Sequence, residues 1–289
     1  MNYVLHLLVL TELYLMLGLS LNLMVGYAGL VTMAHAAFYG VGAYVAALLM
    51  IKFGLGFLPA VAAAVVAAVA LSMIVSLASL RFRGDYFIVA TLAFQILTFA
   101  VLYNWESVTR GPFGVTNIPA PVVAGLRVEG LAAFALLGLC FTLLVGWLLR
   151  RVLHGPFGRT IQAIRDDEVA AASLGKDVVS FKVRTVATAC GCTAVAGALY
   201  ASYVSYIDPT SFNIDESILM LSMVIVGGSG NLRGPFVGAL LLVLLPEALR
   251  FCSLSGSAAA FSRMIIYGLL LIVFMRFRPR GLAGKYQFE

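Results

Sequence analysis

Residues 53–80 read FGLGFLPAVAAAVVAAVALSMIVSLASL, a stretch without a single charged side chain. A helix needs about 20 consecutive apolar residues to cross the hydrocarbon core of a bilayer. This stretch is long enough, and residues 86–105 and 185–207 are uncharged runs of similar length. The sequence therefore predicts a chain that crosses a membrane several times.

The composition excludes a soluble fold. Hydrophobic residues make up 62% of the chain, charged residues only 11%, and the mean hydropathy is +1.02. Soluble domains carry about 25% charged residues. Ten-residue segments of alternating polarity, which are typical of membrane β-barrels, do not occur, and helices satisfy their own backbone hydrogen bonds in lipid. We predict an all-α, polytopic transmembrane helix bundle that forms a single domain over residues 1–289.

The apolar segments predict about eight or nine membrane helices. One segment, residues 217–228, is too short to cross alone and is expected to belong to a Gly-broken or re-entrant helix. The first segment lacks a basic n-region and a cleavage site, so we expect a retained helix. The segments lie near residues 3–25, 33–51, 57–80, 86–105, 130–149, 185–207, 217–228, 235–251 and 260–277.

Lysine and arginine predict the orientation, because they are enriched in cytoplasmic loops. They gather at Arg81 and Arg83, in residues 150–184 and in residues 276–285, and we place these three clusters in the cytoplasm. Residues 106–129 and 208–216 then lie outside. Nine crossings would put the N-terminus outside and the C-terminus inside, whereas eight would move one end. The net charge of +6 fits such loops and gives no basic face for nucleic acid.

Two glycine-rich segments, residues 26–42 and 227–239, are loosely alike and lie in the two halves of the chain. Paired breaks of this kind indicate a translocation path, although small residues also allow close helix packing. We take as candidates for the path Gly26, Gly29, His35, Gly40, Gly42, Gln95, Gly227, Gly228, Gly230 and Gly234.

Polar side chains within the apolar runs have two interpretations. Glu12 is an ionisable group at membrane depth and hence a functional candidate, or it is bonded to a neighbouring helix or to Asn22. His35 could line the path or be a hydrogen-bonded packing residue. Gln95 could likewise join helices instead of contacting solute.

Residues 150–184 form a long polar loop, and such loops usually have a function. Within it, Asp167 is placed to cap a short helix, and Gly175 is placed to end that helix at C′. Small alanines and charges of both signs favour docking into a groove on a partner protein. An ordinary solvated loop is the alternative.

Several segments resemble one family of transport proteins. Ala170, Ala171 and Gly175 match the Glu-Ala-Ala, three residues, Gly pattern of the coupling loop of ATP-binding-cassette import permeases, with Glu168 displaced by one position. Nearly the whole chain resembles the branched-chain amino acid permeases of the LivM type, and it is also similar to permeases for urea and short amides. The segments are GYAGLVTMAHAAFYGVGAY (26–44), RGDYFIVATLAF (83–94), TRGPFG (109–114), AIRDDE (163–168) and GGSGNLRGP (227–235).

The resemblance implies a multi-pass subunit of the bacterial inner membrane that moves branched-chain or other small neutral amino acids by ATP-driven alternating access. It implies a sister permease subunit, two cytoplasmic ATPase subunits and an extracytoplasmic solute-binding protein as partners. ATP and Mg²⁺ would bind to the ATPase subunits, and this chain, which has no phosphate-binding loop, would bind no cofactor and be no enzyme. Coupling to the ATPase would involve Arg159, Arg165, Asp166, Asp167, Glu168, Ala170, Ala171 and Gly175.

Two other classes of membrane protein are less compatible with the residues. An ion-coupled secondary transporter needs carboxylates at mid-membrane, where the chain offers little besides Glu12 and Glu247, which lies near an interface. A membrane-embedded enzyme needs clustered catalytic side chains, and the three histidines, at positions 6, 35 and 154, are scattered. The four cysteines suggest neither a disulfide framework nor a metal site.

A cysteine introduced at Ser173 tests the predicted orientation. We expect a membrane-impermeant thiol reagent to label Ser173→Cys only from the cytoplasmic side, because the loop lies in the most basic part of the chain. Labelling in intact cells would show that the orientation is wrong.

Overall fold

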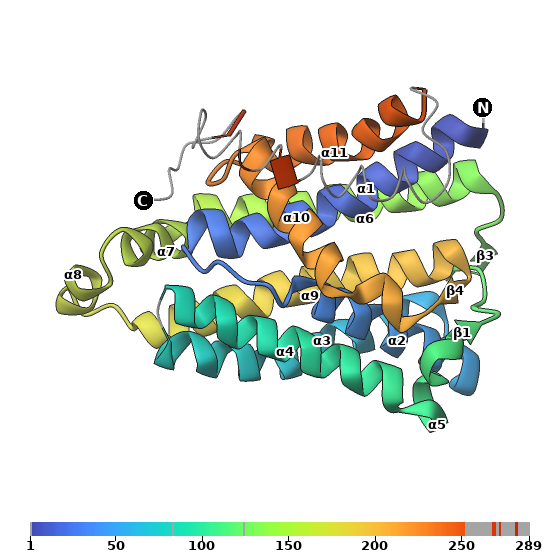
Figure 1. The fold of residues 1–289 in the computed structure, drawn as a ribbon, viewed down its shortest axis with the longest axis horizontal. Helices are drawn as coiled ribbons and strands as arrows, with labels where there is room; N and C mark the ends of the chain where they lie inside the picture. The colour runs from blue at the N-terminus through green and yellow to red at the C-terminus, as the bar shows by residue number, and fades with distance from the viewer. Residues whose placement is uncertain are drawn as a thin grey trace.

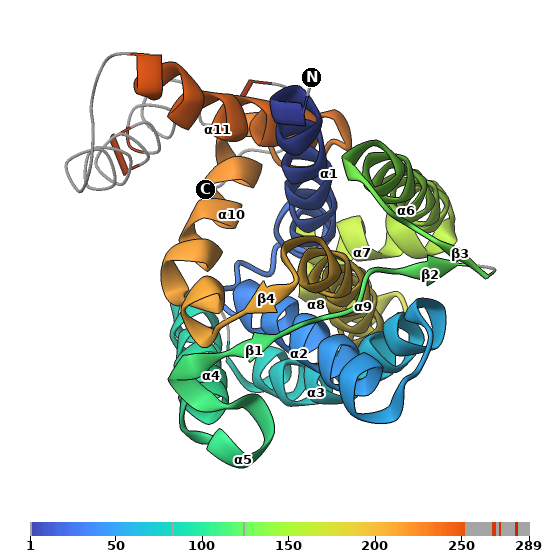
Figure 2. The same cartoon turned by 90° about the vertical axis from the view of Figure 1, so that its right-hand side faces the viewer.

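A computed structural model describes residues 2–82, 84–123 and 125–251, together with residues 268, 269, 272, 281 and 282. The described part is a bundle of roughly parallel and antiparallel helices (Figures 1 and 2). It contains 7 helical elements that are long and apolar enough to cross a membrane. These are α1 (Asn2–Asn22) with its continuation η1 (Leu23–Tyr27), α2 (His35–Phe53), α3 (Phe57–Arg81), α4 (Asp85–Asn104), α6 (Leu131–His154), α9 (Val178–Val204), and η3 (Pro209–Phe212) with α10 (Ile214–Gly227).

The predicted helical bundle is confirmed, but three spans extend beyond their predicted bounds. Helix α6 runs to His154 where the prediction ended at residue 149, and α9 begins at Val178 where the prediction began at residue 185, so both enter the predicted polar loop. The segment predicted at residues 217–228 begins earlier, because Asn213 caps α10 and its side chain accepts a hydrogen bond from the Glu216 amide. Asp215 and Glu216, which hydropathy excludes, are therefore part of this helix. An eighth helix, α11 (Arg233–Phe251), corresponds to the segment predicted at 235–251. The ninth predicted segment, 260–277, lies outside the continuously described residues.

The two ends of the bundle differ in character (Figure 1). At one end, here called the strand end, lie α5 (Glu106–Thr109), η2 (Gly111–Phe113) and an antiparallel pair of short strands, β1 (Val115–Thr116) and β4 (Tyr206–Ile207). The strands β2 (Val122–Val123) and β3 (Leu126–Arg127) pair nearby. At the opposite, basic end lie α7 (Pro156–Asp166) and α8 (Glu168–Ser173). The loops predicted to lie on opposite sides of the membrane are thus at opposite ends.

Helix α9 occupies the centre of the bundle and packs closely against α2 and α3 (Figure 2). A Cβ atom added to Gly42 would lie 2.5 Å from the backbone of Ala194, and one added to Gly197 would overlap the carbonyl oxygen of Tyr39. Small residues allow the backbones of membrane helices to approach in this way. Gly42 therefore serves the packing of α2 against α9.

Helix α2 begins inside the bundle. After η1 the chain runs without regular structure over residues 28–34, and α2 starts at His35 beside Ser20 of α1, with 2.9 Å between His35 Nε2 and Ser20 Oγ. Ser20 lies seven positions before Tyr27, the last residue of η1. At a rise of 1.5 Å per residue, α2 begins about 10 Å inside the end of that helix.

The backbone N–H groups at the start of α2 find partners on other helices. The first N–H groups of a helix have no partner within it, and an unpaired one in an apolar interior costs several kcal/mol. Polar side chains from α4 and α10, themselves apolar helices, accept these hydrogen bonds. The bonds run from Met33 N to Thr91 Oγ1 (3.0 Å), from Ala36 N to Ser217 Oγ (3.0 Å) and from Ala37 N to Gln95 Oε1 (2.7 Å).

The contact between α2 and α9 can be tested with matched glycine substitutions. Gly42→Ala should destabilise the purified protein by about 1–3 kcal/mol, because the new methyl group overlaps the Ala194 backbone. Gly146→Ala is the control, since among the described residues beyond its own helix the methyl group would come nearest to Leu19 Cδ1, at 3.9 Å. Equal unfolding temperatures of the two variants in detergent would contradict the assignment.

Candidate coupling helices and solute path

The polar loop after α6 folds into two short helices that meet at Asp167. Helix α7 begins with Pro156, a residue favoured at the first helical position. Asp167 then caps α8, its Oδ1 accepting a hydrogen bond from Ala170 N at 2.9 Å. Gly175, with φ of +74°, follows the end of α8. The predicted cap at Asp167 and the predicted helix end at Gly175 are confirmed.

Helix α8 is attached to the bundle on one side and exposed on the other. Glu168 Oε2 lies 2.9 Å from Lys182 Nζ near the start of α9, and both side chains are largely buried. Ala171 is also buried, whereas Val169 and Leu174 are 68% and 80% exposed. The apolar surface available to a partner therefore comes from Val169 and Leu174, and Ala171 contributes to the loop's own packing.

Arg165 joins α7 to the first glycine-rich segment. Its Nη1 donates to the carbonyl oxygen of Gly26 at 2.7 Å, while Nε and Nη2 donate to Asp166 Oδ1 at 2.9 and 2.7 Å. A Cβ atom on Gly29 would lie 2.8 Å from Arg165 Cγ, so the glycine makes room for the arginine stem. The other predicted coupling arginine, Arg159, is exposed on α7.

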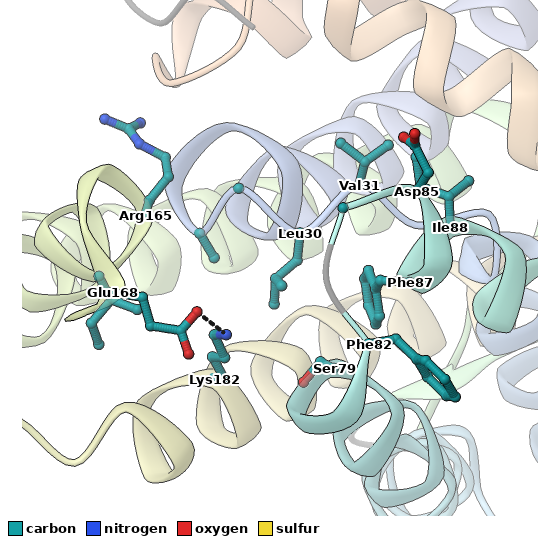
Figure 3. Close-up of a pocket in the computed structure, with 14 residues that line it drawn as sticks. Leu30, Val31, Ser79, Phe82, Asp85, Phe87, Ile88, Arg165, Glu168 and Lys182 are labelled. Carbon is teal, nitrogen blue, oxygen red and sulfur yellow. Dashed lines mark hydrogen bonds and ion pairs between the residues drawn. The ribbon is translucent and has the colours of Figure 1, made fainter. Parts of the chain in front are cut away.

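A cavity of about 310 Å³ separates the two short helices from the turn between α3 and α4 (Figure 3). It is lined on one side by Arg165, Glu168 and Lys182, and on the other by Phe82 and Asp85. Asp85 is the first residue of α4, and Arg83 lies outside the described residues. The α7–α8 loop is therefore held to the bundle mainly through η1 and α9.

The two glycine-rich segments meet at the basic end. Asn22 Oδ1 accepts a hydrogen bond from Gly230 N at 3.0 Å, and Asn22 Nδ2 donates to Asn231 O at 3.1 Å. A Cβ atom on Gly26 would overlap the Gly230 amide, so only glycine permits this approach. The segments predicted to be related thus lie in direct backbone contact.

The remaining glycines of the second segment pack α10 against α11. A Cβ atom on Gly227 would overlap the carbonyl group of Gly234, and one on Gly234 would overlap that of Gly228. In this conformation these glycines form a closed contact between helices. Their role in the path stays a prediction.

His35, Gln95 and Gly40 also lie in contacts between helices. His35 Nε2 is 2.9 Å from both Ser20 Oγ and Thr193 Oγ1, which joins α1, α2 and α9. Gln95 Nε2 donates to the carbonyl oxygen of Phe212 at 2.8 Å, in addition to the bond with Ala37 N. Gly40 packs against the Phe212 ring. These contacts match the alternative interpretation, in which the polar residues hold helices together.

Glu12 is buried between α1 and α6. A Cβ atom on Gly138 would overlap its Oε2, so the glycine leaves space for the carboxyl group. Within the described part of the chain neither carboxyl oxygen has a hydrogen-bond partner, and the proposed partner Asn22 is bonded to the second glycine-rich segment instead. The expected bond of Glu12 to a neighbouring helix or to Asn22 is therefore not found.

A second cavity, of about 250 Å³, lies between α1, α2, η3, α9 and α10 in the half of the bundle nearer the strand end. Figure 2 shows α1, α2 and α10 around α9. We call it the tyrosine cavity. It is lined by Leu10, Leu13, Tyr14, Leu17, Tyr39, Tyr200, Ser211 and Glu216.

Sequence reasoning missed the tyrosine cavity. Its most polar contact joins Tyr14 Oη, as donor, to Glu216 Oε1 at 2.9 Å. Tyr14 stands in the first apolar run, while Glu216 follows an acidic loop that hydropathy assigns to the outside. One available signal was the polar Tyr14 within the first apolar run, but nothing local in the sequence links it to α10.

Comparison with known proteins identifies the family. The family model described as branched-chain amino acid transport system / permease component matches residues 3–274. The high-affinity branched-chain amino acid transport system permease protein LivM of Escherichia coli (strain K12) is 33% identical, covering 94% of this chain and 68% of that protein. The LivM protein of Salmonella typhimurium is 32% identical over the same shares.

A more distant relative extends the likeness beyond bacteria. The probable branched-chain amino acid transport permease protein LivM of Methanocaldococcus jannaschii is 24% identical over 94% of this chain and 91% of that protein. No solved structure matches the chain. These matches support the importer interpretation and not the urea, amide or ion-coupled alternatives. The chain belongs to the family of branched-chain amino acid transport system permease components.

Proposed function

We propose that this multi-pass protein is the permease subunit through which an ATP-binding-cassette importer moves branched-chain amino acids across the bacterial inner membrane. The observation that carries the proposal is the likeness to LivM permeases over 94% of the chain. The transporter would include a sister permease, two cytoplasmic ATPase subunits that bind ATP and Mg²⁺, and an extracytoplasmic solute-binding protein.

In this proposal α8 is the element that the ATPase contacts. Val169 and Leu174 are exposed apolar side chains on a short, capped helix at the basic end. A short helix of this kind can insert into a groove on a partner protein.

Movement of α8 would reach the bundle through two contacts. The Glu168–Lys182 ion pair links α8 to α9, and the bond from Arg165 to the Gly26 carbonyl links α7 to η1. Asn22, one turn before Gly26, holds the break between α10 and α11. A displacement of the coupling helices would therefore act on α9 and on both glycine-rich segments.

Uptake by the complete transporter in proteoliposomes tests the function. We expect accumulation of leucine, isoleucine and valine that requires the solute-binding protein outside and ATP on the ATPase side. A transporter whose ATPase subunits cannot hydrolyse ATP is the control. Full-rate uptake by that control, or the absence of any branched-chain amino acid among the solutes carried, would refute the proposal.

Leu174→Asp tests the docking surface. Because Leu174 is 80% exposed, the substitution should change the stability of the chain by less than about 0.5 kcal/mol, while a charge in a desolvated contact should reduce co-purification of the ATPase at least tenfold. Val122→Asp, at an exposed position of the strand end, makes the same type of change and should leave co-purification unaltered. Normal recovery of the ATPase with Leu174→Asp would rule out α8 as its contact.

A further inference from the structure

We propose that the tyrosine cavity is a solute-binding site in which Glu216 recognises the ammonium group of a small neutral amino acid. The inference rests on the proposed function and adds to it a place where the permease itself holds its solute. It is carried by the charge, shape and composition of the cavity wall.

Glu216 provides the charge. It lies in the first turn of α10, and its amide is fixed by the bond to Asn213 Oδ1 at 3.2 Å. Tyr14 Oη donates a hydrogen bond to Glu216 Oε1 at 2.9 Å. The tyrosine hydroxyl orients the carboxylate but does not neutralise its charge. Among the described residues, those that line the cavity include no lysine, arginine or histidine. A carboxylate at membrane depth needs a cationic partner, and here a bound ammonium group can supply it.

The opposite wall is apolar. Leu10, Leu13 and Leu17 are spaced by three and four positions on α1, so they present one face of the helix to the cavity. An aliphatic side chain can bury its surface against this face at a gain of about 25 cal/mol per Å². The wall therefore selects an ammonium compound with an apolar body over a bare metal cation.

Hydroxyl groups complete the lining. Tyr39 and Tyr200 carry phenolic hydroxyls that can donate a hydrogen bond to a solute carboxylate, whereas the Ser211 hydroxyl already donates to Asp208 Oδ1 at 2.6 Å. The rings of Tyr39 and Tyr200 lie 5.4 Å apart, and they lie 5.1 and 6.0 Å from Phe212. These contacts hold the aromatic wall in place, and Gln95 fixes the Phe212 carbonyl.

The size of the cavity agrees with a small amino acid. At roughly 30 Å³ per water molecule, a volume of about 250 Å³ would hold about eight waters. Valine or leucine has a similar number of non-hydrogen atoms. The volume therefore agrees with one small amino acid as the bound solute.

Equilibrium binding to the purified transporter, without the solute-binding protein and without nucleotide, tests the site directly. Radiolabelled leucine is the probe, with isoamylamine, 4-methylpentanoate and Na⁺ as competitors. We expect isoamylamine to compete and 4-methylpentanoate, which lacks the ammonium group, to compete at least tenfold more weakly. Glu216→Gln should weaken leucine binding about tenfold or more, as expected for the loss of a charged hydrogen bond, and should abolish the preference for the amine.

Asp215→Asn is the matched control, since it removes the same charge from an exposed neighbour outside the cavity. Recovery of the ATPase subunits shows that each variant assembles. If Glu216→Gln does not assemble, Leu10→Trp tests the same cavity by filling it, and leucine binding should then be lost.

The possible results distinguish a failure of the cavity proposal from a failure of the proposed function. If the wild-type transporter imports leucine and Glu216→Gln binds it as well as the wild type, the cavity proposal is wrong and the proposed function stands. Competition by Na⁺ at equal strength to isoamylamine would also overturn it in favour of a cation site. If the wild-type transporter imports no neutral amino acid, both proposals fall.

Discussion

The start of α2 inside the bundle is the constraint on which the rest of the structure depends. Backbone N–H groups cannot be left without partners where water is absent. Thr91, Gln95 and Ser217 meet this requirement from two other helices. Their positions fix α4 and α10 relative to α2, and Gln95 extends the connection to η3 through Phe212. The tyrosine cavity is built on the same elements, so its geometry follows from the way the helix end is satisfied.

Close packing of glycine and alanine supplies the second part of the framework. Gly42 and Gly197 allow α2 and α9 to touch along their backbones, and hydrogen bonds across this contact join His35 to Thr193. Lipid offers no hydrophobic driving force between helices, so van der Waals contact and buried hydrogen bonds hold such a bundle together. The central position of α9 also explains why the ion pair of Lys182 with Glu168 brings the loop close to the core.

The fold class, the spans and the caps at Asp167 and Gly175 could be predicted because their signals are local: runs of apolar residues, charge clusters and turn residues. The roles of Gln95, His35 and Gly42 could be given only as alternatives, since their partners Phe212, Thr193 and Ala194 are far away in the sequence. The hydropathy pattern placed Glu216 in a loop outside the membrane, because hydropathy takes no account of contacts with residues that are far away in the sequence. The cap at Asn213 is a local signal of the same kind as the cap at Asp167, whereas the contact of Glu216 with Tyr14 joins residues that are far apart in the sequence.

Asn22 bonds two neighbouring backbone groups of the second glycine-rich segment, one as acceptor and one as donor. Because Gly230 and Asn231 are neighbours, a single side chain holds both backbone groups, and the Gly26–Gly230 contact brings the two backbones together. Asn22 thus joins the first half of the chain to the second through two hydrogen bonds at one point. Any rearrangement that parts the two glycine-rich segments therefore has to break both hydrogen bonds of Asn22.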